Sequence, residues 1–339
     1  MGVIITNRSE LIGRTSEIIG FKSGLGLNRD EFAEIIPHKF YDLWFGEDDA
    51  MIRFRSEVYE ELISHLLYEV GNTATPSHVS PTILLSKKYR DNPETAKMYL
   101  DLMQLFIKFQ QNAIQAARVL QKKEINPTIF IETAKKKYGI VGRYIALEII
   151  EAINLRLHKS PWGISRKVNW KDTAELTELF KSESLETPHG KFIDQRYIDY
   201  LSHNFDSIGE IHWRKFEALT CEFFEKQGYY VEIGEGRNDD GIDARIWLKE
   251  NDKSGPATIL VQCKRYKSKI EKMVVKSLWA DVLAYGAESG LIVTTSSLAP
   301  GAETVCTARN YQITEANRET LKNWINVMRT PYTGVFLAE

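Results

Sequence analysis

The spacing of apolar residues changes partway along this 339-residue chain. Between about residues 27 and 182, apolar side chains recur every three or four positions, which is the spacing of amphipathic helices. Beyond about residue 205, helical stretches alternate with short runs of two-residue spacing, which is typical of strands. A chain of this length also exceeds what one core usually fills. We therefore expect an all-α N-terminal domain followed by an α/β domain.

A polar connection separates these two parts. Residues 181–191 contain Pro188 and Gly190 among charged and hydroxyl side chains, a composition typical of exposed connections. We expect a helical domain over 1–185, a linker over 186–205, an α/β domain over 206–330 and a short tail over 331–339.

Individual elements can be predicted in both parts. Asp91-Asn92-Pro93-Glu94 places a capping residue before a proline, which predicts a helix from Pro93 towards Leu120. Another helix is expected over 141–157. In the second part we expect helices over 213–227, 274–285 and about 302–309, and strands over 229–233, 242–248, 258–263 and 290–295. The order is α-β-β-β-α-β, followed by a helix.

Composition and charge indicate an ordinary soluble protein. Hydrophobic residues make up 43% of the chain, and no apolar run approaches the roughly 20 residues that a membrane span needs. The first residues lack the pattern of a secretory signal, so we expect a cytoplasmic protein with no membrane partner. Cys221, Cys263 and Cys306 form no paired motif and are expected to be buried thiols. With 44 basic and 46 acidic residues, any site for nucleic acid must be local.

Three residues around two expected strands form a candidate catalytic site. Asp243 ends a turn and begins one strand, whereas Gln262 and Lys264 take alternate positions on the next and so emerge from one face. Aspartate and glutamine oxygens can bind a metal ion, and a lysine can hold water and offset charge on a phosphorane. Asp243 and Gln262 are therefore predicted metal ligands, and Lys264 is a predicted catalytic residue. The alternatives are a solvated turn aspartate and a lysine that guards an edge strand.

Glu217 is the third predicted metal ligand. It lies on the expected helix 213–227 and could reach the metal from the side of the sheet. The alternative is a carboxylate on the helix surface, which is what we expect of Glu222 and Glu225.

A basic segment follows Lys264. It carries the predicted DNA-binding residues Arg265, Lys267, Lys269, Lys272 and Lys276, with Tyr266 among them. Such a stripe can follow a phosphate backbone, although charge runs are often only solvated surfaces. The hydroxyl residues of 294–297 could contact phosphates or could cap the next helix.

Several motifs occur in a recognisable order: Phe216-Glu217, Asp240-Gly241-Ile242-Asp243, Val261-Gln262-Cys263-Lys264-Arg265-Tyr266 and residues 292–296. In this order they resemble the Mrr-like restriction endonucleases, a branch of the PD-(D/E)xK nucleases, over about residues 206–330. The resemblance implies a restriction-endonuclease-like fold with a mixed sheet flanked by helices, and DNA cleavage that depends on Mg²⁺, for which Mn²⁺ can substitute. It places Glu217, Asp243, Gln262 and Lys264 at matching positions. Gln262 replaces the usual second acid, so Asp240 could supplement the ligands, and one or two metals are both possible.

We therefore expect a metal-dependent DNA endonuclease that acts in bacterial defence. By analogy with Mrr-like proteins, the N-terminal domain would sense a target or control activation, and its long apolar helices favour docking of a partner protein or a second copy. Two alternatives remain. One is a DNA-binding or scaffolding protein of the same fold with little or no catalysis, because Gln262 weakens the metal site. The other is a repair or recombination nuclease acting on branched DNA.

Overall fold

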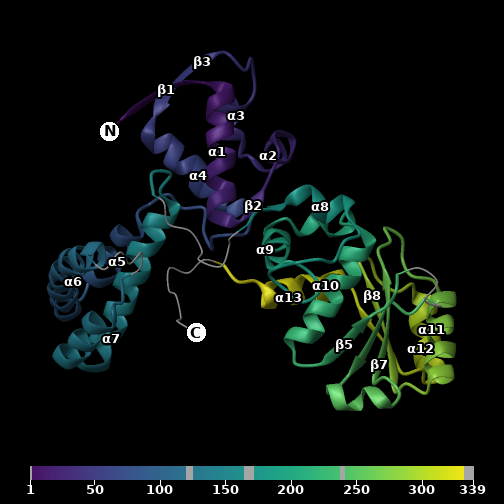
Figure 1. Ribbon diagram of the computed structural model, residues 1–339. Helices are drawn as coiled ribbons and strands as arrows, with labels where there is room; N and C mark the ends of the chain where they lie inside the picture. Colours follow the sequence, from purple (N-terminus) through teal and green to yellow (C-terminus); the bar gives the residue numbers. More distant parts are fainter. Residues whose placement is uncertain (1, 120–124, 164–171, 237–240, 332–339) are drawn as a thin grey trace.

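The chain forms three parts, which Figure 1 shows in a computed structural model. The structure describes residues 2–119, 125–163, 172–236 and 241–331. We call residues 2–70 together with 172–181 the first lobe, residues 81–159 the helical insertion, and residues from 205 onward the α/β domain. The chain leaves the first lobe after α4 (Ser56–Glu69) and returns to it at β4 (Ala174–Glu175), so the helical insertion interrupts that lobe.

The first lobe is mainly helical, as predicted for the N-terminal region. Besides α4 and β4, its elements are β1 (Val3–Asn7), α1 (Arg8–Ser23), β2 (Leu25–Gly26), α2 (Arg29–Ile35), α3 (Tyr41–Trp44), β3 (Met51–Arg55) and α8 (Leu176–Lys181). β1 pairs antiparallel with β3, and β2 pairs in parallel with β4. These small sheets were not predicted, because strands of two to five residues carry little periodic signal.

The helical insertion consists of α5 (Pro81–Arg90), α6 (Pro93–Val119) and α7 (Thr128–Lys159). The predicted helix start at Pro93 is confirmed, and the Asn92 side chain accepts a hydrogen bond from the Glu94 amide at 2.9 Å. The insertion has its own core, formed by Leu85, Tyr99, Leu102, Phe106, Phe130, Ile145 and Ile149, among others. None of the helices in the described part of the chain is long and apolar enough to cross a membrane.

The α/β domain is built on a mixed sheet with the strand order β5-β6-β7-β8-β9. Its strands are β5 (Tyr230–Ile233), β6 (Ala244–Trp247), β7 (Ile259–Lys264), β8 (Ser289–Thr294) and β9 (Ile313–Ala316), and its helices are α10 (Trp213–Lys226), α11 (Lys272–Tyr285), α12 (Pro300–Arg309) and α13 (Arg318–Met328). The first three strands pair antiparallel and the last three pair in parallel. The α-β-β-β-α-β order is confirmed, whereas β9 and α13 were not predicted.

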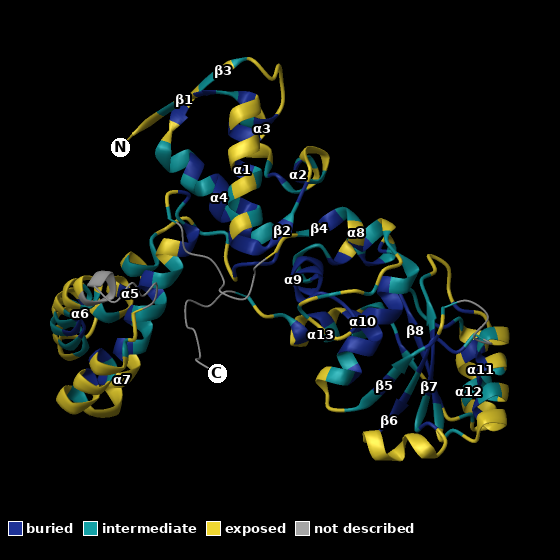
Figure 2. Ribbon diagram, in the orientation of Figure 1, coloured by how far each residue is buried: buried dark blue, intermediate teal, exposed yellow. Residues whose placement is uncertain are grey.

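Helices cover both faces of this sheet, and the sheet lies between them in Figure 2 as a mainly buried layer. On one face, Val261 of β7 packs in the same core as Phe216 of α10 and Leu321 of α13. On the other, Leu260 packs with Leu278 of α11 and Ala302 of α12. The central strand β7 is therefore apolar on both sides until it reaches Gln262, where polar side chains begin.

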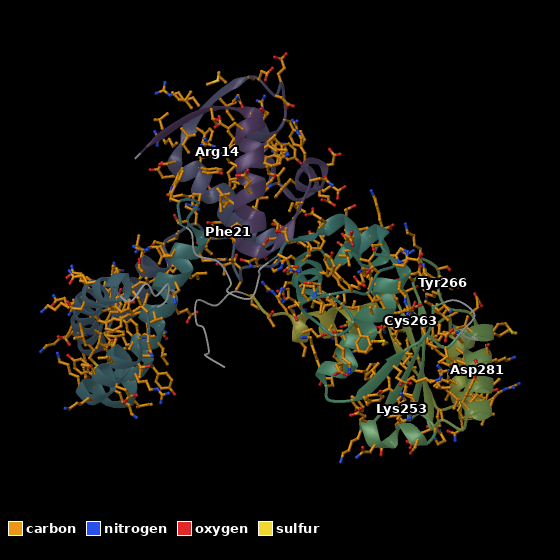
Figure 3. All side chains as sticks on the ribbon, in the orientation of Figure 1. Arg14, Phe21, Lys253, Cys263, Tyr266 and Asp281 are labelled. Atoms are coloured by element: carbon orange, nitrogen blue, oxygen red, sulfur yellow. The ribbon has the colours of Figure 1, made fainter. Side chains whose placement is uncertain are left out.

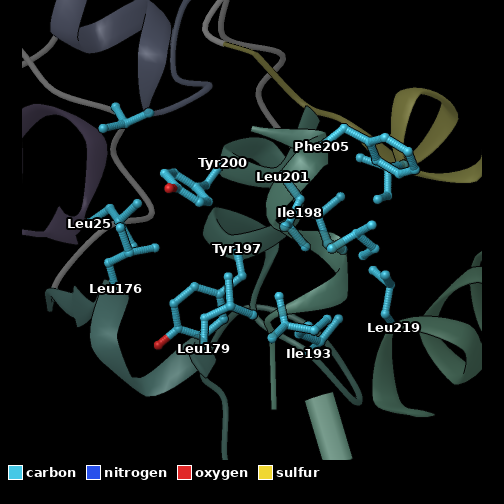
Figure 4. Close-up of a cluster of buried hydrophobic side chains, with 14 of the residues drawn as sticks. Leu25, Leu176, Leu179, Ile193, Tyr197, Ile198, Tyr200, Leu201, Phe205 and Leu219 are labelled. Carbon is cyan, nitrogen blue, oxygen red and sulfur yellow. The ribbon is translucent and has the colours of Figure 1, made fainter. Parts of the chain in front are cut away.

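The expectation of a linker over 186–205 is wrong for most of that segment. Helix α9 (Gln195–His203) is buried along residues 195–201. Figure 4 shows Tyr197, Ile198 and Leu201 between Leu25 and Leu176 of the first lobe and Leu219 of α10. The same continuous core includes side chains of the first lobe, α9 and the α/β domain.

Hydrogen bonds explain how this polar helix can be buried. The Arg196 guanidinium pairs with Asp194 at 2.8 Å and donates to the Gly24 carbonyl of the first lobe at 2.9 Å. Gly71, with φ 76°, brings its backbone against the Asp199 carbonyl so closely that a Cβ atom would overlap it. The polar side chains of α9 are therefore buried with hydrogen-bond partners and are not exposed to solvent.

Candidate active site

Asp243 is fixed against β7 by two hydrogen bonds. Its amide donates to the Val261 carbonyl at 2.9 Å, and its Oδ2 accepts from the Cys263 amide at 2.6 Å. The residue is 8% exposed and follows Gly241, whose φ of 80° makes the turn. The alternative of a solvated turn aspartate is therefore wrong, because the carboxylate lies on the backbone between Gln262 and Lys264.

Gln262 and Lys264 occupy the end of β7, which lies between β6 and β8 and is not an edge strand. The Gln262 amide nitrogen donates to the Gly241 carbonyl at 3.0 Å. Its Oε1 is buried and has no hydrogen-bond partner in the described part of the chain. Lys264 is half-buried and forms no ion pair with any described residue. The edge-strand alternative for Lys264 is wrong, and both side chains are available for a bound group.

Glu217 is buried on α10, with 6% of its surface exposed, so the alternative of a surface carboxylate is wrong. Arg214 Nη1 donates to Glu217 Oε2 at 2.8 Å, and Arg214 Nη2 donates to the Gly234 carbonyl at 2.7 Å. Burial raises the pKa of Glu217 to about 8; the hydrogen bond from Arg214 opposes this rise, and the adjacent Asp243 carboxyl adds to it. Two carboxyl groups thus meet at one end of the sheet.

The prediction that Glu222 faces solvent is wrong. It is 3% exposed, and its Oε2 accepts from the Lys191 and Phe192 amides at 2.9 and 2.8 Å. Glu225 is half-buried and pairs with Lys191 at 2.9 Å. These two carboxylates tie α10 to the segment before α9 and are not part of the site.

The polar groups at this sheet end fit a divalent cation. Ionising Glu217 beside Asp243 is unfavourable, which a bound cation would relieve, and the unpartnered Gln262 Oε1 would offer a neutral oxygen. Within the described residues, no group of three or more His, Cys, Asp and Glu side chains is placed to hold a metal. Asp240, the suggested supplement, lies outside the described residues.

Arg214 was not among the predicted site residues. Its guanidinium joins Glu217 to the backbone after β5, and only 13% of the side chain is exposed. The signal was available, because an arginine three residues before a glutamate on a helix lies on the same side of that helix. We assign Arg214 a positioning role for Glu217.

The cysteines near the site are not nucleophiles. Burial raises the pKa of the Cys221 and Cys263 thiols well above the ordinary value, so both are protonated near neutral pH. Cys263 Sγ lies 3.7 Å from Thr220 Oγ1, on the α10 side of β7. Cys221 is buried as expected, and Cys263 and Cys306 are partly exposed.

The basic segment begins directly after β7, where Figure 3 labels Cys263 and Tyr266. Arg265 donates to the Ile211 carbonyl, so this guanidinium ties β7 to the start of α10. Lys267 pairs with Glu210 at 3.1 Å on the surface. Lys269, Lys272 and Lys276 form no ion pair with described residues. These three cations are therefore not neutralised by described residues.

The hydroxyl residues after β8 are partly committed to the fold. Thr294 is fully buried, and its hydroxyl accepts from the Ser296 amide at 3.1 Å. Thr295 donates to the Tyr266 carbonyl at 3.0 Å. These two threonines support the strand ends rather than offering free hydroxyls.

A protein-family model matches the α/β domain that carries these residues. Residues 208–325 match the restriction endonuclease family, through the model of its Mrr catalytic domain. Among solved structures, the chain is similar to the MspJI restriction endonuclease in complex with a 27-mer oligonucleotide, with 19% identity and a TM-score of 0.27. That similarity covers 52% of this chain and 38% of the other, and no curated protein matches. Residues 208–325 thus match the Mrr-type restriction endonuclease domain and have a restriction-endonuclease-like fold, and they follow an N-terminal region that is helical.

Proposed function

We propose that the protein is a DNA endonuclease that hydrolyses phosphodiester bonds with the help of a divalent cation. The observation that carries the proposal is the buried pair Glu217 and Asp243, in which Asp243 accepts from the amide between Gln262 and Lys264. Of these two neighbours, Gln262 has an unpartnered buried oxygen and Lys264 forms no ion pair with a described residue. Without a cation, Glu217 and Asp243 can both ionise only by concentrating negative charge in a buried place, which costs free energy. The match to restriction endonucleases supports hydrolysis of DNA as the reaction.

Each polar residue has a distinct role in this proposal. Glu217, Asp243 and the Gln262 oxygen would hold Mg²⁺, for which Mn²⁺ can substitute. When bound, the ion supplies positive charge that makes a water molecule more acidic and offsets charge on the phosphate. Lys264 orients the attacking water and stabilises the extra negative charge of the transition state. Arg214 holds Glu217 in place.

Lys269, Lys272 and Lys276 would contact the phosphate backbone beside the scissile bond. Their position directly after β7 supports this role, since the catalytic lysine ends the same strand. Arg265 and Lys267 contribute less, because both have partners within the protein.

We further propose that this nuclease acts in the cytoplasm as an effector of defence against foreign or modified DNA, regulated through the N-terminal region by a partner protein or a second copy. The restriction endonuclease match supports the defence role. A non-cleaving, DNA-binding role is favoured by one observation, the presence of Gln262 where an acid would bind metal more strongly.

A plasmid assay separates these functions. The intact protein is incubated with supercoiled plasmid with and without Mg²⁺, in parallel with Lys264→Ala and with Lys249→Ala, which removes an exposed lysine elsewhere in the same domain. We expect Mg²⁺-dependent nicking that Lys264→Ala abolishes and Lys249→Ala leaves intact. Equal activity of the two variants would overturn the assigned site. Modified, linear and branched substrates then distinguish defence from repair.

A further inference from the structure

The helical insertion differs sharply in charge from the rest of the protein. Residues 81–159 contain fourteen basic and seven acidic residues, whereas the whole chain has 44 basic and 46 acidic residues and a formal charge of −2. The insertion therefore carries an excess of seven positive charges on a chain that is otherwise acidic. A local excess of this size attracts polyanions.

Part of this positive charge lies at a break in helix α7. At Gly139, with φ 63° and ψ −147°, α7 divides into two helical segments. Gly142, in the first turn of the second segment, lies against the Ala134 carbonyl of the first, and a Cβ atom there would overlap it. The two segments are thus packed directly on each other around a short glycine turn. DNA-binding helix-turn-helix proteins pair two helices around a short, often glycine-containing turn.

The side chains at this turn are exposed and unpaired. Ile140 and Tyr144 are 55% and 61% exposed, and Lys135, Lys136 and Arg143 are exposed beside them. None of these three cations forms an ion pair with a described residue. In Figure 2 the end of α7 farthest from the first lobe is mostly coloured as exposed. We call Lys135, Lys136, Ile140, Arg143 and Tyr144 the α7 patch.

The nearby acids are already neutralised by other groups. Asp101 pairs with Lys137 at 2.6 Å and accepts from the Tyr138 hydroxyl at 3.0 Å. Glu148 pairs with Lys88 at 2.6 Å and accepts from the Tyr89 hydroxyl at 2.8 Å. Glu132, which is exposed one turn before Lys136, is the acidic residue of the first segment of α7. The α7 patch therefore keeps its positive charge.

We propose that the helical insertion binds duplex DNA through the α7 patch, at a site separate from the nuclease domain. The second segment of α7 carries Arg143 and Tyr144 in its first turn. In helix-turn-helix proteins, this part of the second helix contacts base edges, so we assign that role to Arg143 and Tyr144. Lys135 and Lys136, in the first segment, would contact phosphates. The choice of DNA among polyanions rests on the proposed function. The binding itself does not require a catalytic site.

Binding of a labelled 30-base-pair duplex to the full-length protein tests this site, measured by fluorescence anisotropy at several salt concentrations in the presence of a chelator. Lys135→Gln, Lys136→Gln and Arg143→Gln are combined in one variant. The matched control combines Arg90→Gln, Lys97→Gln and Lys108→Gln, which removes the same charge from exposed positions of α5 and α6. Unchanged melting temperatures show that both variants fold.

We expect the patch variant to bind at least about tenfold more weakly, and its slope of log affinity against log salt to fall by about 2 to 3, one contact for each lost cation. The control variant should change affinity by less than about threefold. Equal loss in the two variants, or tighter binding of single strands or duplex RNA, would overturn the proposal. If the unaltered protein fails to cleave plasmid with Mg²⁺ but patch-dependent binding persists, the nuclease proposal fails and this one stands.

Discussion

The α/β domain and the helical insertion arrange their charges in opposite ways. In the α/β domain, Glu217 and Asp243 are buried, and burial together with the Asp243 carboxyl raises the pKa of Glu217. In the insertion, Lys135, Lys136 and Arg143 lie outside a separate apolar core and are exposed. Burial strengthens the electrostatic interactions that a catalytic site uses, whereas exposed cations can contact a long polyanion. This contrast predicts that cleavage and target binding can be changed independently in this protein.

The largest effect is expected from Asp243→Asn. The side-chain oxygen can still accept from the Cys263 amide, so the fold is kept, but the anionic ligand is lost. We expect cleavage to fall by about 10³-fold or more, measured in single-turnover reactions with Mg²⁺. Asp252→Asn, at an exposed position of the same domain, serves as the control.

Duplex binding sharpens the same experiment. Asp243→Asn should bind DNA in chelator as tightly as the unaltered protein, because the α7 patch is untouched. A parallel loss of binding and cleavage would show instead that one site serves both.

The next largest effect concerns the core shared by the first lobe, α9 and the α/β domain. Gly71→Ala places a Cβ atom in the Asp199 carbonyl at a left-handed backbone position, and should lower the free energy of unfolding by roughly 2 to 4 kcal/mol. Chemical denaturation followed by Trp fluorescence measures it. Gly13→Ala, on the exposed face of α1 with no atom within 4 Å of its Cβ, should instead stabilise by about 0.5 to 1 kcal/mol.

A smaller and more local effect is expected from Gly142→Ala. The Cβ atom would displace the two segments of α7, which should destabilise the insertion by about 1 to 3 kcal/mol. Hydrogen exchange should accelerate in α6 and α7 while β7 and β8 keep their protection. Gly301→Ala in α12 is the control, because its Cβ would meet open space. Faster exchange in β7 as well would show that the insertion and the α/β domain unfold together.

The sequence predicted the parts of the site that depend on local spacing. Gln262 and Lys264 share one strand, and Asp243 directly precedes the strand beside it, so strand geometry alone brings them near one another. The burial of Glu217 and its hydrogen bond from Arg214 depend on how α10 packs on the sheet, which no local pattern records. The catalytic roles of these residues stay predictions.

The buried helix α9 shows more clearly that burial cannot be predicted from residue types alone. Asp194, Gln195, Arg196 and Asp199 favour an exposed linker when only residue types are considered. In the structure, their partners come from distant positions: the Gly24 carbonyl, the Met328 carbonyl and the Thr330 amide. A polar segment can be buried when tertiary hydrogen bonds satisfy it, and those partners cannot be read from the segment itself.

The smallest expected effect is the pH dependence of metal binding, which tests whether the buried Glu217 is a metal ligand. Desolvation, reinforced by Asp243, raises the pKa of Glu217 from 4.5 to about 8, so without metal the folded protein retains a proton that the unfolded chain releases. Stability without metal therefore falls as pH rises through that window. A cation competes with this proton, so its stabilisation should grow with pH.

The melting temperature with and without 5 mM Mg²⁺, or Ca²⁺ as a second probe, measures this linkage at pH 5.5, 6.5 and 8. We expect the shift caused by metal to increase by a few degrees, about 2 to 4 °C, across the range. Glu217→Gln should show a small shift that does not vary with pH, whereas Glu225→Gln, half-buried on the same helix, should behave as the unaltered protein. A metal shift that is the same at all three pH values in the unaltered protein would mean that Glu217 is not a ligand, and that its proton belongs to the fold alone.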